Sequence, residues 1–278
     1  MQPIHVSSLV YLLPLLGLAS AQCPQVHVFG ARETTVSPGY GTAGSVVTSI
    51  VNSYSGATAE AITYPACGGQ SSCGSVSYAS SVQQGTRAVA SQVNAYNTQC
   101  PNTVLVLVGY SQGGQIFDNG YCGGGDPGQG VTDTSIPISA AARTKIAAAI
   151  FMGDPRFRAG FSYNVGTCSQ YGFDPRDAGF QCPYASNIQS YCDSTDPYCC
   201  QGSDANSHQQ YANKYGTQAL NFVKTKVNAL LNGGGSSTTN STTTTTTTSG
   251  GGGGTCSALW GQCGGTGWTG ATCCSSGK

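Results

Sequence analysis

Residues 103–114 read Thr103-Val-Leu-Val-Leu-Val-Gly-Tyr-Ser-Gln-Gly-Gly114, six apolar or β-branched residues followed by a glycine-flanked serine. The apolar run is typical of a strand that is buried on both faces of a parallel sheet. The spacing G-x-S-x-G at residues 109–113 predicts a sharp turn, because glycine lets two backbone segments come close together. Such a turn from strand to helix lifts the Ser111 hydroxyl above the sheet edge, where a base can activate it.

The composition narrows the class of protein. The chain has 278 residues, with 11 basic side chains against 11 acidic ones and only 3 histidines. Because so few and so balanced charges form no basic patch, we expect neither nucleic acid nor a membrane as a partner. The scarcity of histidine and the absence of paired C-x-x-C units disfavour a metal site, so we expect no metal or other cofactor. Nothing in the sequence indicates more than a monomer.

The first 21 residues predict a secretory signal peptide. Residues 9–18 are mostly apolar, and Ala19-Ser-Ala21 after them matches an A-x-A cleavage site. The apolar run is too short to span a bilayer. We therefore expect a secreted, extracellular protein in which the 14 cysteines serve mainly as disulfides.

Three further segments differ in composition. Residues 22–231 are mixed and long enough for one domain with its own core. Residues 232–255 are almost entirely Gly, Ser and Thr, so we expect a linker, with O-glycans on its threonines and an N-glycan at the Asn240 sequon. Residues 256–278 form a small cysteine-rich tail, expected to be a disulfide-linked β unit.

Strand-like and helix-like segments alternate along the main domain. The expected strands are 26–29, 59–64, 103–108, 148–152 and 187–191, and the expected helices are 40–54, 78–96, 113–119, 140–147 and 211–230. This alternation predicts an α/β fold with a parallel sheet covered by helices on both faces. The order of the segments is that of a small α/β-hydrolase, a three-layer sandwich.

A serine nucleophile needs a base, and two histidines follow the predicted signal peptide. His27 lies inside the first expected strand, ahead of the serine, and is interpreted as a packing residue. His208 comes after the last expected strand and just before the last helix, where the order Ser…Asp/Glu…His has its base. His208 is therefore the candidate base.

Several aspartates between the serine and the histidine are candidates for the acid that orients the base. Asp154 follows one expected strand, whereas Asp193 and Asp196 follow the strand nearest to the histidine in sequence. An acid at that strand end can bind the far nitrogen of the imidazole and stabilise the imidazolium. A disulfide between Cys192 and Cys199 would fix the geometry of Asp196, so we favour Asp196, with Asp193 as the runner-up.

The tetrahedral intermediate of ester hydrolysis needs hydrogen-bond donors for its oxyanion. One candidate is the backbone N–H of Gln112, the residue after the nucleophile. The second donor is expected from the loop after the first strand, residues 31–35.

Six motifs of the main domain are considered as one set. They are Val28-Phe-Gly-Ala-Arg-Glu-Thr-Thr35, Tyr64-Pro-Ala-Cys-Gly-Gly69, Gly109-Tyr-Ser-Gln-Gly-Gly114, Ile150-Phe-Met-Gly-Asp-Pro155, Tyr191-Cys-Asp-Ser-Thr-Asp-Pro-Tyr-Cys-Cys200 and Ser207-His208. With these motifs, residues 22–231 resemble the cutinase-like family of serine esterases, most closely its fungal acetylxylan esterases. The resemblance implies Ser111 as nucleophile, Asp196 as acid, His208 as base, and Thr34 with Gln112 as the oxyanion-hole pair. It also implies five disulfides: Cys23–Cys100, Cys67–Cys73, Cys122–Cys182, Cys168–Cys200 and Cys192–Cys199.

The residues around the candidate base indicate the length of the acyl group that the enzyme accepts. Cutinases flank the histidine with apolar residues that accept fatty acyl chains, whereas here the sequence is Ser207-His-Gln-Gln210. Tyr198 follows the candidate acid closely and is a candidate to close a substrate pocket. Short acyl groups, acetate foremost, are therefore favoured over long ones.

The tail Cys256-Ser-Ala-Leu-Trp-Gly-Gln-Cys-Gly-Gly-Thr-Gly-Trp-Thr-Gly-Ala-Thr-Cys-Cys274 resembles a fungal cellulose-binding module. The resemblance implies that Trp260, and less clearly Trp268, stack on glucose rings, and that Cys256 can pair with Cys273. The family pattern continues with further cysteines and an aromatic residue, so we expect a partial module whose binding to cellulose is weak or lost.

Together these features predict a secreted serine esterase that deacetylates acetylated xylan during plant cell-wall degradation through an acyl-enzyme. One alternative is a cutinase-type esterase that acts on longer acyl chains. An alternative of another class is a non-catalytic wall-binding protein.

Overall fold

The computed structural model describes residues 22–233. The predicted signal peptide, most of the linker and the tail, with Asn240, Trp260, Trp268, Cys256 and Cys273, therefore lie outside the described residues. The helices and strands are β1 (Val26–Ala31), α1 (Gly44–Val51), β2 (Thr58–Ala61), α2 (Tyr78–Gln99), β3 (Val104–Tyr110), α3 (Gln112–Cys122), α4 (Ala140–Arg143), β4 (Ile146–Met152), β5 (Asn164–Val165), β6 (Ile188–Tyr191) and α5 (Tyr211–Gly233).

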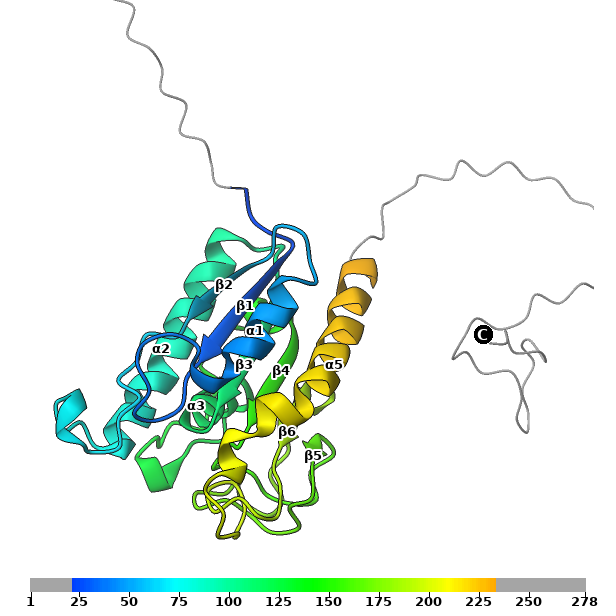
Figure 1. The fold of residues 1–278 in the computed structure, drawn as a ribbon. Helices are drawn as coiled ribbons and strands as arrows, with labels where there is room; N and C mark the ends of the chain where they lie inside the picture. The colour runs from blue at the N-terminus through cyan, green and yellow to red at the C-terminus, as the bar shows by residue number, and fades with distance from the viewer. Residues whose placement is uncertain (1–21, 234–278) are drawn as a thin grey trace, which may run out of the picture. The chain divides into compact units, whose positions relative to one another are not determined.

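The strands of the described residues form one sheet, and every neighbouring pair is parallel. Their order across the sheet is β2-β1-β3-β4-β6-β5. Helices cover both faces: α1 and α5 pack on one side and α2 and α3 on the other (Figure 1). The predicted α/β sandwich with a central parallel sheet is confirmed.

The sheet has a hydrophobic core on each of its two faces, and β3 contributes side chains to both. Successive side chains of a strand point to opposite faces, so Val104, Val106 and Val108 contribute to the core under α1 and α5. Leu105 and Leu107 instead contribute to the core under α2 and α3. The strand lies at the middle of the sheet and is buried on both sides, as its continuous apolar run predicts.

Some boundaries differ from those expected. The expected helix over residues 140–147 ends at Arg143, because Ile146 already pairs with Leu105 of β3 and Ala147 is part of β4. Tertiary pairing here overrides the helix propensity of the alanines. The two-residue strand β5 was not expected, and α5 runs to Gly233, two residues into the expected linker.

The topology opens a crevice at one edge of the sheet. From β1 the chain adds β2 on one side, and β3 then pairs on the other side of β1. Loops that leave the carboxyl ends of β1 and β3 therefore diverge, and ligands of open α/β sheets bind at such a point. Residues 32–35 and Ser111 follow these two strand ends.

The cysteines of the described residues form five disulfides: Cys23–Cys100, Cys67–Cys73, Cys122–Cys182, Cys168–Cys200 and Cys192–Cys199. These are the pairs that the family resemblance implies. In the same part of the chain, every helix is too short or too polar to cross a bilayer.

Candidate active site

Ser111 lies on a strained turn between β3 and α3. Its backbone φ is 51°, in the left-handed region that side chains other than glycine rarely adopt. Its N–H donates to the carbonyl of Met152 over 2.7 Å, which anchors the turn to β4. A Cβ at Gly109 would lie 2.4 Å from the Gly113 carbonyl oxygen, and one at Gly113 would lie 2.2 Å from the Ala31 oxygen. The two glycines of G-x-S-x-G are thus required by backbone contacts.

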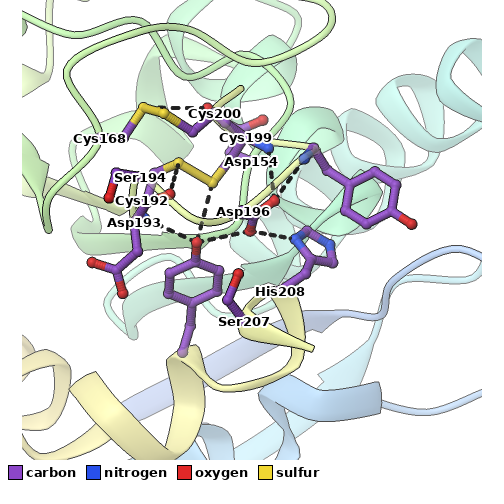
Figure 2. Close-up of a disulfide and its surroundings, with 12 residues drawn as sticks. Asp154, Cys168, Cys192, Asp193, Ser194, Asp196, Cys199, Cys200, Ser207 and His208 are labelled. Atoms are coloured by element: carbon purple, nitrogen blue, oxygen red, sulfur yellow. Dashed lines mark hydrogen bonds and ion pairs between the residues drawn. A yellow bond between two sulfur atoms is a disulfide. The ribbon is translucent and has the colours of Figure 1, made fainter. Parts of the chain in front are cut away.

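His208 and Asp196 form a buried pair. Nδ1 of His208 lies 2.7 Å from Oδ2 of Asp196, and the two side chains are 5% and 0% exposed (Figure 2). An ionised carboxylate only accepts hydrogen bonds, so the imidazole carries its proton on Nδ1 and leaves Nε2 free to act as a base. The Tyr110 hydroxyl donates to the His208 carbonyl over 2.6 Å and fixes the short 3-10 turn Ser207–Gln209.

Asp196 is held in its ionised form by several donors. Its Oδ1 accepts the N–H groups of Tyr198 and Cys199, and its Oδ2 accepts the Tyr211 hydroxyl as well as the imidazole. Burial alone would raise the pKa of Asp196, but the His208 contact and these donors bring it below its ordinary value. The carboxylate is therefore an anion that can stabilise an imidazolium.

The other candidate acids have different partners. Asp154 accepts the N–H of Arg156 at 2.9 Å, and burial, with Asp118 nearby, raises the pKa of Asp154 well above its ordinary value. Asp193 accepts Lys214 Nζ at 2.7 Å and the Tyr215 hydroxyl at 2.8 Å. Of the three aspartates weighed from the sequence, Asp196 is the one that contacts His208.

Ser111 and His208 line the same cavity, which has a volume of about 410 Å³. The remaining lining residues are Glu33, Thr34, Thr35, Tyr78, Phe173, Tyr198 and Gln209. No hydrogen bond of the described residues joins Ser111 to His208, although both face this space. Nucleophile–base contacts in unliganded serine hydrolases are often long and shorten when substrate binds.

The two expected oxyanion donors lie beside the nucleophile. Gln112 is the first residue of α3, where backbone N–H groups have no partner within the helix. Its side chain is buried and is held by Ser81 Oγ at 2.8 Å and by the Cys67 carbonyl at 3.1 Å. Thr34 lies in the loop after β1 and lines the cavity. The residue after it, Thr35, has a φ of 72°.

A polar cluster lies behind Tyr78, another residue that lines the cavity. The Tyr78 hydroxyl donates to Gln115 Oε1 over 2.6 Å. The amide of Gln115 in turn donates to Asp126 at 2.9 Å and to Asp174 at 2.6 Å. Burial, together with the neighbouring Asp126 carboxyl, raises the pKa of Asp174 to about 6. Phe173 adds its ring, edge-on to Tyr78 with 5.5 Å between centroids.

Four residues around the catalytic groups were not predicted from the sequence: Tyr211, Gly153, Tyr78 and Phe173. The position of Tyr211, three residues after the candidate base and at the start of α5, is a weak indication that it lies near His208. Gly153 packs so closely that an added Cβ would lie 2.7 Å from His208 Cε1. Tyr78 and Phe173 have no local signal, because they come from α2 and from an irregular loop that meet only in the folded chain.

A metal has no obvious ligands in this part of the chain. Among residues 22–233, one group of possible ligands is close enough, the sulfur atoms of Cys168, Cys192 and Cys200, all within 4.8 Å. Each of these sulfurs is part of a disulfide, so none is a thiolate that could bind a metal.

Two family models match parts of this chain. Residues 22–227 match the family model for cutinase, and residues 259–278 match that for the fungal cellulose binding domain. Over 265 residues the chain is 64% identical to Cutinase 11 of Verticillium dahliae, which covers 94% of this chain and 90% of that protein. It is 56% identical over 259 residues to an acetylxylan esterase of Hypocrea jecorina, covering 92% of this chain and 85% of the relative.

The fold matches a solved structure of similar sequence. The catalytic core domain of an acetyl xylan esterase from Trichoderma reesei is 60% identical, with a TM-score of 0.73. The match covers 74% of this chain and 100% of that one.

Proposed function

The chain belongs to the cutinase family of carboxylic ester hydrolases, and within that family we propose that it removes acetyl groups from acetylated xylan. The observation that carries the proposal is the buried Asp196–His208 pair, which faces the same cavity as Ser111 on its strained turn. This arrangement supports nucleophilic catalysis through an acyl-enzyme.

In the proposed reaction, Ser111 Oγ attacks the acetyl carbonyl carbon while His208 Nε2 takes the hydroxyl proton. The N–H groups of Gln112 and Thr34 stabilise the oxyanion, and each such donor contributes roughly 10²–10³-fold to kcat. The tetrahedral intermediate then breaks its bond to the sugar oxygen, which leaves with the proton from His208. Asp196 keeps the imidazole oriented and stabilises its charged form.

Water completes the cycle. His208 removes a proton from water, the resulting hydroxide attacks the acetyl-serine, and acetate leaves as the proton returns to Ser111 Oγ. The same base therefore serves both halves of the reaction, and the enzyme returns to its starting state.

The lining of the cavity supports a short acyl group on a polar substrate. Glu33, Thr34, Thr35 and Gln209 line it beside the aromatic rings, so a long aliphatic chain would cover polar groups without binding them. Relatives described as acetylxylan esterases add support. The second candidate is hydrolysis of longer esters, which the 64% identity to Cutinase 11 favours.

The remaining parts of the chain fit a plant-wall enzyme. Residues 259–278 match the fungal cellulose binding domain, and we infer that this partial module gives at most weak attachment to cellulose. Five disulfides in the described residues support a secreted protein.

The experiment is acetate release from acetylated xylan by the full chain and by its Ser111→Ala variant. We expect release by the wild type and a loss of at least about 10⁴-fold in the variant, with an unchanged melting temperature. Equal activity in both would identify a non-catalytic wall-binding protein with a contaminating esterase. A series of nitrophenyl esters separates the two enzymes, since a rate maximum at octanoate or longer would exclude the acetyl assignment.

A further inference from the structure

Large apolar side chains gather on the surface beside the candidate active site. Among residues 22–233, those that are exposed are Tyr171, Phe173 and Tyr198, at 41%, 53% and 42%. Single exposed rings are common in proteins, but a cluster marks a binding surface more often. We call these three side chains the aromatic rim.

Two side chains of the aromatic rim belong to the catalytic cavity, and the third is close to them in sequence. Phe173 and Tyr198 line the cavity of Ser111, whereas Tyr171 lies two residues before Phe173 and is not among the lining residues. The two segments are hydrogen-bonded to each other, with the Phe173 N–H donating to the Tyr198 carbonyl over 3.1 Å. Two of the three rings therefore border the space next to Ser111, and the third lies on the same segment as Phe173.

Each ring of the rim is supported from within the protein. The Arg158 guanidinium lies 5.4 Å from the centroid of Tyr171, and Phe173 packs edge-on to Tyr78. Tyr198 packs on His208 with 4.6 Å between ring centroids. The rings are therefore positioned before any substrate binds, which lowers the entropic cost of binding.

Covalent bonds hold the two segments of the rim together. Cys168, three residues before Tyr171, is bonded to Cys200, two residues after Tyr198. The Cys192–Cys199 disulfide lies beside it and closes the loop that carries Asp196 (Figure 2). The rim is thus fixed to the same cross-linked unit as the catalytic acid.

The chemistry of the rim matches a neutral sugar. The face of an aromatic ring is electron-rich and attracts the C–H groups that a pyranose presents on its flat side. Only 8% of the chain is charged, and the cavity next to the rim offers hydroxyl and amide groups from Thr34, Thr35 and Gln209. Aromatic rings together with hydroxyl and amide groups suit a polyhydroxylated chain better than an aliphatic one.

We propose that the aromatic rim binds the sugar rings of the polysaccharide that neighbour the esterified residue, and so selects polymer over small esters. The inference rests on the proposed function, because it assigns a second part of the same substrate. Tyr171 gives the cleanest test, since it contacts neither Ser111 nor His208 and is not part of the cavity lining.

The test compares Tyr171→Ala and Tyr171→Phe with the wild type in the full chain. On soluble acetylated xylan we expect Tyr171→Ala to lower kcat/KM about five- to tenfold, because one aromatic contact with the sugar is lost. The change should appear as a higher KM, with kcat almost unchanged. On nitrophenyl acetate, which does not reach Tyr171, the rates should differ by less than about twofold. Tyr171→Phe keeps the ring and should keep the activity on xylan.

A binding measurement separates this inference from the proposed reaction. Unsubstituted xylo-oligosaccharide is titrated calorimetrically into Ser111→Ala and into the Ser111→Ala, Tyr171→Ala double variant. Weaker binding by the double variant supports the rim even if the wild type releases no acetate from xylan. Equal binding, or a Tyr171→Ala defect seen on nitrophenyl octanoate but not on xylan, would overturn it.

Discussion

The two aspartates of the loop after β6 lie three residues apart, yet they have different partners. Asp196 contacts His208 (Figure 2) and the Tyr211 hydroxyl. Asp193 instead contacts Lys214 and Tyr215 on α5. Burial would raise the pKa of both carboxyls, but their hydrogen-bond donors lower it below the ordinary value in each case. Both are therefore anions, and ionisation alone does not distinguish them.

What distinguishes them is the group that each anion stabilises. The charge of Asp196 acts on an imidazole that borders the cavity, so it can affect a proton transfer there. The charge of Asp193 acts on an ammonium group whose side chain is 52% exposed and on Thr167 after β5, so it holds α5 and that segment in place without acting on the cavity. A perturbed pKa therefore indicates a catalytic group only when its partner reaches the site.

Asp196→Asn should give the largest effect of the changes that test this contrast. The amide can donate to Nδ1 and favour the wrong imidazole tautomer, so we expect kcat to fall about 10³–10⁴-fold with little change in KM. Steady-state kinetics on nitrophenyl acetate measures the loss. Asp154→Asn is the matched control, since the pKa of Asp154 already lies well above its ordinary value, and it should keep near-normal activity.

Gly153→Ala should disturb the contact between Asp196 and His208 by displacing the imidazole. Gly153 has a φ of +64°, and its added Cβ would lie 2.7 Å from His208 Cε1 and 2.9 Å from Nδ1. Because the imidazole must shift from the position in which Nδ1 contacts Asp196, we expect kcat/KM to fall about 10²-fold. Gly160→Ala is the control, since its φ of +97° imposes a similar backbone strain while nothing lies within 4 Å of the new Cβ. Equal losses in both variants would attribute the effect to strain alone.

Asp193→Asn should leave kcat within about twofold and instead lower the free energy of unfolding by about 1 kcal/mol at pH 7. The pKa of Asp193 is lowered in the folded protein, so its stabilisation is present above the ordinary value of about 3.9 and disappears as the pH falls through the lowered one. Denaturant unfolding at several pH values should show the two proteins converging in acid. A stability difference that persists there would contradict the ion-pair explanation.

Local patterns predicted the parts of this molecule that depend on local sequence. The continuous apolar run of β3 predicts a strand buried on both faces, and the two glycines beside Ser111 predict a tight turn. The central strand and the nucleophile could therefore be predicted from residues 103–114 alone. The pairing of His208 with Asp196 was reached through chain order and a family resemblance, and the structure brings the two together.

The remainder depends on contacts between distant segments. The boundary between α4 and β4 is set by pairing of Ile146 with Leu105, and the alanines nearby carry no sign of it. Phe173 reaches the cavity because its loop is hydrogen-bonded to Tyr198, a contact with no pattern in the sequence. Such long-range packing decides the shape of the pocket even where the catalytic groups are foreseeable.

The ends of the sheet have a consequence for the protein at high concentration. At one end, β5 consists of only Asn164 and Val165. At the other end, the four-residue β2 carries Glu60, whose side chain is 39% exposed. Long, flat, uncharged edges recruit strands from other copies and start aggregates, whereas short or charged edges do not. Neither end of the described sheet therefore offers a long, flat, uncharged strand to the sheet of a second copy.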